Sequence, residues 1–298
     1  MTQHLQTSVI GSYPLPLDSS TMMQQYFSHE DVSWEPYITT AVQEMLATGV
    51  DLVSDGQTRD PMIELFTRRL SGCRVRNRTE IIGKILYHQP ITIDDQKLVR
   101  QLLPKKKGVI GILTGPFTLA RSCVDLYYHD EQKLALDFAE ALRQEAEHLE
   151  QYVDLISIDE PCFANDLPPY AHELLDTITN HITCHSRLHV CGDVSSIVPQ
   201  LLDMPVSILS HEFKASPHLF DSFKHYSCTK QICLGSVRSD DPRVEPIEEI
   251  VTHINKGLDV FGKQIVQIAP DCGQRYLPHE VAFQKLKNLV QARGCVNG

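Results

Sequence analysis

The chain has 298 residues, of which 42% are hydrophobic and 22% are charged, and this balance permits a large buried core and argues against disorder. Its formal net charge of −11 argues against binding to nucleic acid or to an anionic membrane, because both would be repelled. The sequence has neither a signal-peptide pattern nor a bilayer-spanning apolar run, so we expect a cytoplasmic protein whose nine cysteines are free thiols or metal ligands.

Short apolar runs alternate along the chain with stretches of helical periodicity, which is the pattern of βα units. The expected strands are 8–13, 50–55, 109–114, 154–159, 187–191, 207–212, 231–235 and 265–268. The expected helices are 37–47, 133–152, 171–182, 196–202, 217–223, 246–258 and 279–292. Eight strands, each followed by helical sequence, predict one (β/α)8 TIM barrel over residues 1–298, with a doubly wound open sheet as the alternative.

Residues 59–107 follow this pattern less regularly than the rest of the chain. An apolar run at 84–93 is typical of a strand pair, because it is bounded by polar and turn-forming residues. We therefore expect a hairpin-like insertion before the third barrel strand, within the same domain.

Candidate metal ligands follow three of the expected strands. His189 and Cys191 end the fifth strand, where residues two apart point to the same face. Glu212 ends the sixth strand and Cys272 follows the eighth, so all four reach the C-terminal rim, where such barrels place their active sites. Thiolate, imidazole and carboxylate ligands together favour zinc. His211 should point away from the barrel interior, because side chains alternate along a strand.

Other interpretations of these residues stay open on spacing alone. A lone His-x-Cys at a strand end is often a core cysteine beside a histidine. A rival group of His181, Cys184 and His185 lies at a helix end, where its side chains would spread around the helix axis. Gly235 and Ser236 on the seventh strand are small and would leave room for an ion.

Six motifs occur in order along nearly the whole chain: Ile10-Gly11-Ser12-Tyr13-Pro14, Ser54-Asp55-Gly56-Gln57-Thr58-Arg59, Leu113-Thr114-Gly115-Pro116, Ile158-Asp159-Glu160-Pro161, His189-Val190-Cys191-Gly192 and Pro270-Asp271-Cys272-Gly273. Together they resemble the cobalamin-independent methionine synthase family, in particular its C-terminal catalytic barrel and the short archaeal-type forms. The resemblance implies that His189, Cys191, Glu212 and Cys272 bind one zinc ion.

The same resemblance implies an amino-acid pocket for homocysteine. Ser12 and the backbone of Ile10 and Gly11 would hold its amino-acid end, and Asp159 would pair with its ammonium through a charge-assisted hydrogen bond. Gln57 stands where the long enzymes carry a glutamate, so its ammonium contact would be weaker. The alternative interpretations are purely structural: Ser12 would cap a strand end and Asp159 would cap a helix.

The expected reaction is methyl transfer to the homocysteine thiol, which must lose its proton to become a good nucleophile. The resemblance to the short forms favours a methylated corrinoid as donor, carried on a protein or free, and methyltetrahydrofolate is the alternative. Asp240 stands near the position of a histidine that the long enzymes use as an acid, so it is the candidate proton donor. The competing functions are a methylcorrinoid:coenzyme M methyltransferase, a metal-free decarboxylase of the uroporphyrinogen type, and a noncatalytic zinc protein.

Overall fold

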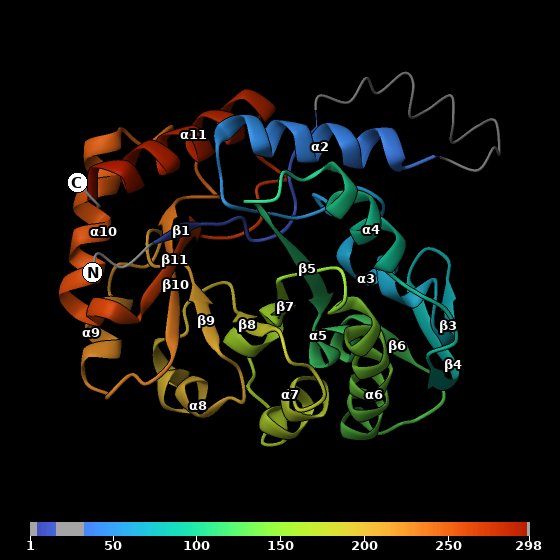
Figure 1. Cartoon of the computed structure of the whole chain (residues 1–298). Coiled ribbons are helices and arrows are strands. Elements are labelled where there is room, and N and C mark those ends of the chain that lie inside the picture. The colour runs from blue at the N-terminus through green and yellow to red at the C-terminus, as the bar shows by residue number, and fades with distance from the viewer. Residues whose placement is uncertain (1–4, 16–32, 297–298) are drawn as a thin grey trace.

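Parallel strands form a barrel in the computed structural model, which describes residues 5–15 and 33–296 (Figure 1). Their hydrogen-bonded order is β1-β11-β10-β9-β8-β7-β5-β2, and every adjacent pair is parallel. The predicted (β/α)8 architecture is confirmed. The strands are β1 (Gln6–Thr7), β2 (Leu52–Val53), β5 (Gly108–Thr114), β7 (Leu155–Asp159), β8 (His185–His189), β9 (Ile208–His211), β10 (Gln231–Val237) and β11 (Ile265–Pro270).

Hydrogen bonds between Asp51 and Thr7 close the ring between β1 and β2, two strands that form no ladder with each other in the described part of the chain. The Asp51 amide donates to the Thr7 carbonyl at 3.0 Å, and Asp51 Oδ2 accepts bonds from the Thr7 amide and hydroxyl at 3.0 and 2.9 Å. Lys107 and Arg293 lie 3.1 and 3.0 Å from the same carboxylate. Asp51 therefore replaces the missing ladder, with its charge balanced by two cations.

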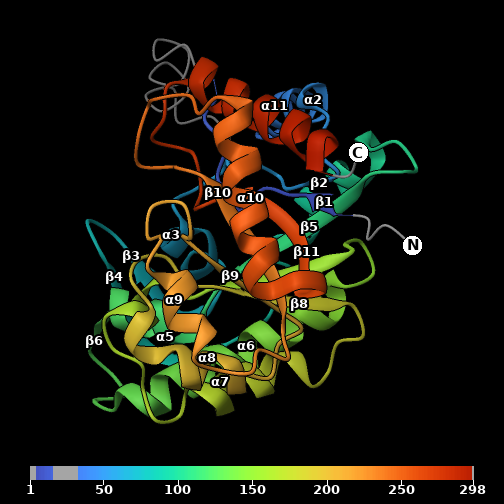
Figure 2. The ribbon, with the colours of Figure 1, turned by 90° about the vertical axis from the view of Figure 1, so that its left-hand side faces the viewer.

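Helices cover the outside of the barrel, and α2 packs beside α11 in both views (Figure 1, Figure 2). α6 shows why such segments are helical: Asp130 caps its first turn by accepting from the Lys133 amide at 3.1 Å, and its apolar face is buried. Three helices that the sequence did not predict are α3 (Met62–Thr67), α4 (Ile93–Leu102) and α5 (Pro116–Ser122). The others are α2 (Glu35–Thr48), α6 (Glu131–Leu149), α7 (Ala171–Thr179), α8 (Val198–Asp203), α9 (Leu219–Lys224), α10 (Ile247–Phe261) and α11 (His279–Val296), with 3-10 turns η1 (Pro161–Ala164), η2 (Ser195–Ile197) and η3 (Gly262–Gln264). Within 5–15 and 33–296, none of the helices is both long and apolar enough to cross a membrane.

The insertion before β5 contains β3 (Ser71–Val75) and β4 (Thr79–Leu86), which form a small sheet at the edge of the molecule together with β6 (Val124–Asp125), a strand that follows β5 (Figure 1). β3 and β4 form an antiparallel hairpin, so a hairpin is present but begins earlier than the predicted 84–93. That run is divided between the end of β4 and the start of α4. In the connection between them, the Ile91 and Thr92 amides donate to buried Glu145 of α6 at 2.9 and 2.6 Å. These bonds hold the chain just before α4.

The first strand is displaced from its predicted range of 8–13. The Ser8 amide still donates to the Ile268 carbonyl at 2.9 Å, but by Tyr13 the chain donates to the Gly56 carbonyl at 3.0 Å instead. Residues 9–13 therefore leave the ladder with β11, and the Gly11 carbonyl and Tyr13 amide instead bond Ser54 and Gly56, just beyond β2. This exit places Ile10, Gly11 and Ser12 over the C-terminal rim.

Candidate metal centre and amino-acid pocket

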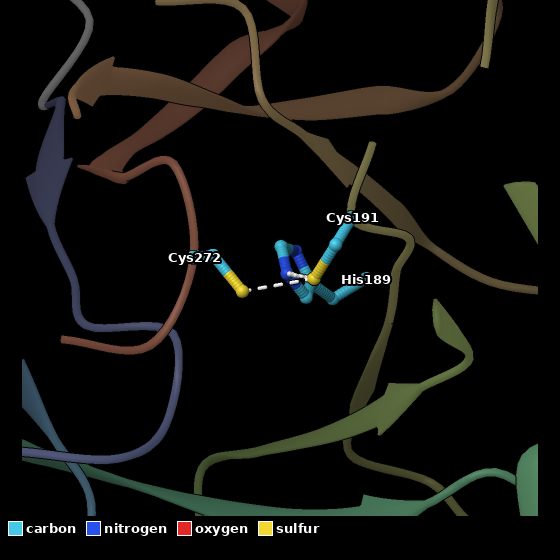
Figure 3. Close-up of side chains that lie close together, drawn as sticks. All are labelled: His189, Cys191 and Cys272. Carbon is cyan, nitrogen blue, oxygen red and sulfur yellow. Dashed lines mark hydrogen bonds between the residues drawn. The ribbon is translucent and has the colours of Figure 1, made fainter. Parts of the chain in front are cut away.

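His189, Cys191 and Cys272 meet at the C-terminal rim of the barrel, with their side chains pointing toward one another (Figure 3). His189 ends β8, Cys191 lies two residues further, and Cys272 follows β11. His189 Nε2 is 3.0 Å from Cys191 Sγ, which is 2.8 Å from Cys272 Sγ. One ligand atom from each lies within 4.8 Å of the others. Three of the four predicted zinc ligands are thus brought together, although His189 and Cys272 are 83 residues apart in the sequence.

The electrostatics of this group favour ionisation of one of the two thiols, that of Cys272. A hydrogen bond from Cys191, helped by His189, holds the pKa of Cys272 well below that of an ordinary thiol, although burial opposes this. The same hydrogen bond, together with burial, raises the pKa of Cys191. His189 Nδ1 lies 3.1 Å from Ser210 Oγ, which leaves Nε2 facing the sulfurs. An imidazole oriented through its other nitrogen, beside two thiols, is the donor set that zinc prefers.

Glu212 lies beside this group but outside its compact set of ligand atoms. It follows β9 directly and is half-buried. Burial raises the pKa of its carboxyl, while a hydrogen bond from the Gly192 amide opposes that shift. Cys272 and His189 are close enough to act on it electrostatically. Its place as a fourth ligand stays a prediction.

The backbone of Cys272 is held by two residues that the sequence analysis did not assign. Ser239 Oγ donates to the Cys272 carbonyl at 2.7 Å and accepts from its amide at 3.1 Å. Buried Asp271 accepts bonds from the Lys214 and Ala215 amides at 3.0 and 2.7 Å, so it ties the loop after Glu212 to the loop of Cys272. The Pro-Asp-Cys-Gly motif was the only sequence signal for Asp271, and it does not identify these partners.

Gly235 serves a different purpose from the one predicted for it. A Cβ atom there would lie 2.2 Å from Asp271 Oδ1 and 2.5 Å from the His211 carbonyl oxygen. Its lack of a side chain therefore makes room for the Asp271 carboxylate rather than for an ion. Ser236 is buried and donates to the Leu234 carbonyl. His211 packs against Phe213 and also against Phe223, which lies in α9, away from the sulfurs, as strand alternation predicted.

A cavity of about 280 Å³ opens beside the sulfurs. Its wall contains every residue that the sequence analysis assigned to the homocysteine pocket, namely Ile10, Gly11, Ser12, Gln57 and Asp159. His189, Cys191 and Cys272 lie in the same wall. A ligand of amino-acid size can therefore reach the sulfurs with one end and a buried carboxylate with the other.

The polar groups of this cavity are fixed by the surrounding backbone. The Ser12 carbonyl accepts from the Gln274 amide at 2.7 Å, which ties the exit of β1 to the Cys272 loop. Gln57 has a left-handed backbone, with φ of 46°, and its amide donates to Asp55 Oδ1 at 2.9 Å. Its buried side-chain Nε2 has no partner among the described residues, so it is available to a ligand.

Two acidic motif residues have different surroundings. Asp159 is buried, which raises the pKa of its carboxyl, while His189 and Arg187 lower it in part. Neighbouring Glu160 accepts from the Phe117 amide at 2.9 Å and from the Thr118 amide and hydroxyl at 2.8 and 2.6 Å. Glu160 is therefore a helix cap for α5, whereas Asp159 faces the cavity.

Asp240 is not in the wall of that cavity. Its carboxylate accepts two hydrogen bonds from the Arg238 guanidinium, both at 2.8 Å. This pairing lowers the pKa of Asp240, so near neutral pH the group holds no proton to donate. The structure thus gives little support to the predicted acid role, which stays untested.

Comparisons with known proteins show the family and the fold of the chain. Residues 5–294 match the family described as "Cobalamin-independent synthase, Catalytic domain". A protein named methionine synthase from Methanothermobacter marburgensis is 35% identical, over 96% of this chain and 98% of its own length, and one from Methanocaldococcus jannaschii is 33% identical, over 96% and 97%. A B12-independent methionine synthase from Shewanella sp. W3-18-1, solved in complex with selenomethionine, has a similar fold, with a TM-score of 0.83, 22% identity and coverage of 98% and 97%.

Proposed function

The chain belongs to the cobalamin-independent methionine synthase family and is a methyltransferase, and from this premise we propose that it methylates the thiol of homocysteine at a zinc ion held by His189, Cys191, Glu212 and Cys272. One observation carries the proposal. The cavity that contains the sulfurs also contains Ser12 and Asp159, so metal ligands and amino-acid contacts share one space. Residues 1–298 would act as one catalytic domain.

The donor set suits zinc better than a harder ion. Two thiols and an imidazole lie within 4.8 Å of one another, and magnesium or calcium would prefer oxygen ligands. With Cys191, Cys272 and Glu212 ionised around Zn²⁺, the count of three negative charges against two positive leaves a net charge of −1. Zinc bound there would lower the thiol pKa of an arriving substrate and hold its sulfur in place. Glu212, outside the compact group, is the ligand best placed to give way to that sulfur.

The amino-acid end of homocysteine would be held by other residues of the same cavity wall. Asp159 offers a carboxylate to the ammonium, which makes a charge-assisted hydrogen bond in a buried setting. Ser12 and the backbone of Ile10 and Gly11 would receive the other polar groups, and Gln57 has an unpaired buried Nε2 for a carboxylate oxygen. Fixing both ends aligns the sulfur for attack on a methyl group, which is the contribution of positioning to the rate.

The proposed methyl donor is a methylated corrinoid, free or carried by a partner protein, with methyltetrahydrofolate as the alternative. The words "cobalamin-independent" in the family description weigh against a corrinoid as resident cofactor, so the corrinoid enters here only as a substrate. Both donors hand over a methyl cation equivalent to the sulfur and leave with the electron pair. A folate leaving group needs a proton, and the lowered pKa of Asp240 makes it a poor source.

A coenzyme M acceptor is the competing function within this fold. Its sulfonate would meet the Asp159 carboxylate in the same cavity, which is unfavourable because like charges repel. The decarboxylase alternative does not use the His/Cys/Cys group. A noncatalytic zinc site would not require an amino-acid cavity beside the sulfurs.

The test uses enzyme of measured zinc content, with L-homocysteine or coenzyme M as acceptor and methylcobalamin or methyltetrahydrofolate as donor. Methionine should form with one zinc per chain. Cys272→Ser should lose both zinc and activity, whereas Cys228→Ser should keep both, because Cys228 lies outside the site and its thiol bonds the Lys230 carbonyl. Methylation of coenzyme M without methylation of homocysteine would refute the acceptor, and full activity in Cys272→Ser would refute the ligand set.

A further inference from the structure

Arg187 is a fully buried arginine in the barrel interior, with 0% of its surface exposed. It precedes His189 by two residues on β8, so both side chains point to the same face of the strand. Burying a guanidinium costs free energy unless its donors and its charge are satisfied. The proposed chemistry assigns Arg187 no role, so its position in the barrel needs an explanation.

Every hydrogen-bond partner of the guanidinium among the described residues is neutral. Two of them are carbonyls of the segment that follows β1: Val9 at 3.1 Å and Ile10 at 3.5 Å, both from Nη2. A third is Ser157 Oγ, at 3.2 Å from Nε. The remaining partners, all to Nη1, are Ser8 Oγ at 3.0 Å, Gln267 Oε1 at 3.3 Å and Cys233 Sγ at 3.7 Å.

The contact with Ser157 leads directly to the cavity. Ser157 Oγ donates to Asp159 Oδ1 at 2.9 Å, and a hydroxyl has only one hydrogen to give. Because Arg187 donates to the oxygen of Ser157, that hydrogen is directed at Asp159. No other donor to the Asp159 side chain is found among the described residues, so its second oxygen is left for a ligand in the cavity that Asp159 lines.

We infer that Arg187 is a positioning residue that makes the cavity selective for an α-amino group. It orients Asp159 through Ser157, and it fixes the Val9 and Ile10 carbonyls so that Gly11 and Ser12 face the same ligand. Its positive charge, which forms no direct ion pair within residues 5–15 and 33–296, offsets the negative charge of Asp159 in a buried setting. This inference rests on the proposed function, because it assumes that the ligand is an amino acid.

The test measures binding of the reaction product, which requires neither a methyl donor nor a metal. Isothermal titration calorimetry gives the Kd of L-methionine and of 4-(methylthio)butanoate, which is methionine without its amino group. The wild-type protein should prefer methionine. The ratio to compare is the Kd of 4-(methylthio)butanoate divided by the Kd of L-methionine. In Arg187→Met this ratio should fall by about tenfold or more, which is the usual contribution of a hydrogen bond to a charged group. Arg187→Lys, which keeps the charge, should recover part of the ratio.

Two further variants separate this role from a structural one. Ser157→Ala removes only the link between Arg187 and Asp159, so it should also lower the ratio, and it serves if Arg187→Met does not fold. Cys233→Ala alters the packing around the same guanidinium but leaves that link intact, so it should keep the wild-type ratio. An unchanged ratio in Ser157→Ala and in any folded Arg187 variant would overturn the inference. A wild-type protein that does not bind methionine would instead remove the proposed function on which the inference rests.

Discussion

Substitution of Gly235 by alanine should damage the metal centre without touching any ligand. The new Cβ would lie 2.2 Å from Asp271 Oδ1 and 2.5 Å from the His211 carbonyl oxygen, closer than any Cβ contact allows. The carbonyl belongs to β9 and moves with difficulty, so the Asp271 carboxylate must leave. It would then release the Lys214 and Ala215 amides.

The magnitude follows from those two amides. A buried donor left without a partner costs about 1–3 kcal/mol; the two amides are part-buried, so losing both costs at most about 6 kcal/mol of unfolding free energy, less whatever water or relaxation restores. Asp271 adjoins Cys272 in the chain, so the same shift moves a ligand. Loss of groups that orient ligands lowers metal affinity by about 10–100-fold, and we expect Gly235→Ala to fall in that range.

The assay is competition for zinc against a chelator of known affinity, paired with urea unfolding. Gly257→Ala is the matched control, because its Cβ would lie 2.7 Å from the flexible end of Leu234, so it crowds the core but not Asp271. The control should change stability alone. Wild-type zinc affinity in a folded Gly235→Ala protein would refute the claim that Asp271 positions Cys272.

Three further outcomes follow from the structure. Zinc binding near neutral pH should release at least one proton per chain, because the pKa of the Cys191 thiol is raised and zinc binds the thiolate; calorimetry in buffers of different ionisation enthalpy measures it, and zero release would contradict the proposed thiolate pair. The pKa of buried His253 is lowered from 6.5 to about 4, so its stabilising contribution is present above pH 6.5 and is lost as the pH falls toward 4. Between pH 7.5 and 5, urea unfolding should show that the wild type loses about 2 kcal/mol more unfolding free energy than His253→Gln. Equal losses in the two proteins would refute this. Removing zinc with a chelator should leave far-UV circular dichroism unchanged, because the apolar core does not include the ligands; cooperative unfolding on chelation would contradict it.

The barrel was predictable because its strands carry an unambiguous signal. Strands of a parallel barrel are buried on both faces, so runs such as 109–114 read as continuous apolar sequence. The first strand was misplaced because residues 8–13 are as buried as a strand while their hydrogen bonds go elsewhere. Helices α3 and α5 have six and seven residues, which is too short for helical periodicity to be recognised.

The site was predictable only in part. The place of His189 at a strand end was predictable, whereas Cys191 lies beyond the end of β8, and the meeting with Cys272 was implied by resemblance to a family and not by spacing. The roles of Asp271 and Arg187 could not be predicted, because their partners lie far away in the sequence: Asp271 bonds Lys214, and Arg187 bonds Val9. Such contacts depend on the three-dimensional closure of the barrel, which local pattern does not encode.

The positions of the proposed metal ligands explain why so many buried polar groups surround them. Cys191, Glu212 and Cys272 all lie just beyond the ends of their strands, where the sheet no longer fixes the backbone. Two thiols held 2.8 Å apart would repel once ionised, so the ligand loops need restraints of their own when no ion is bound. Ser239 and Asp271 supply them for Cys272. Because these restraints come from hydrogen bonds between loops, and not from the ion, the rim can stay organised while a substrate sulfur enters and a product leaves.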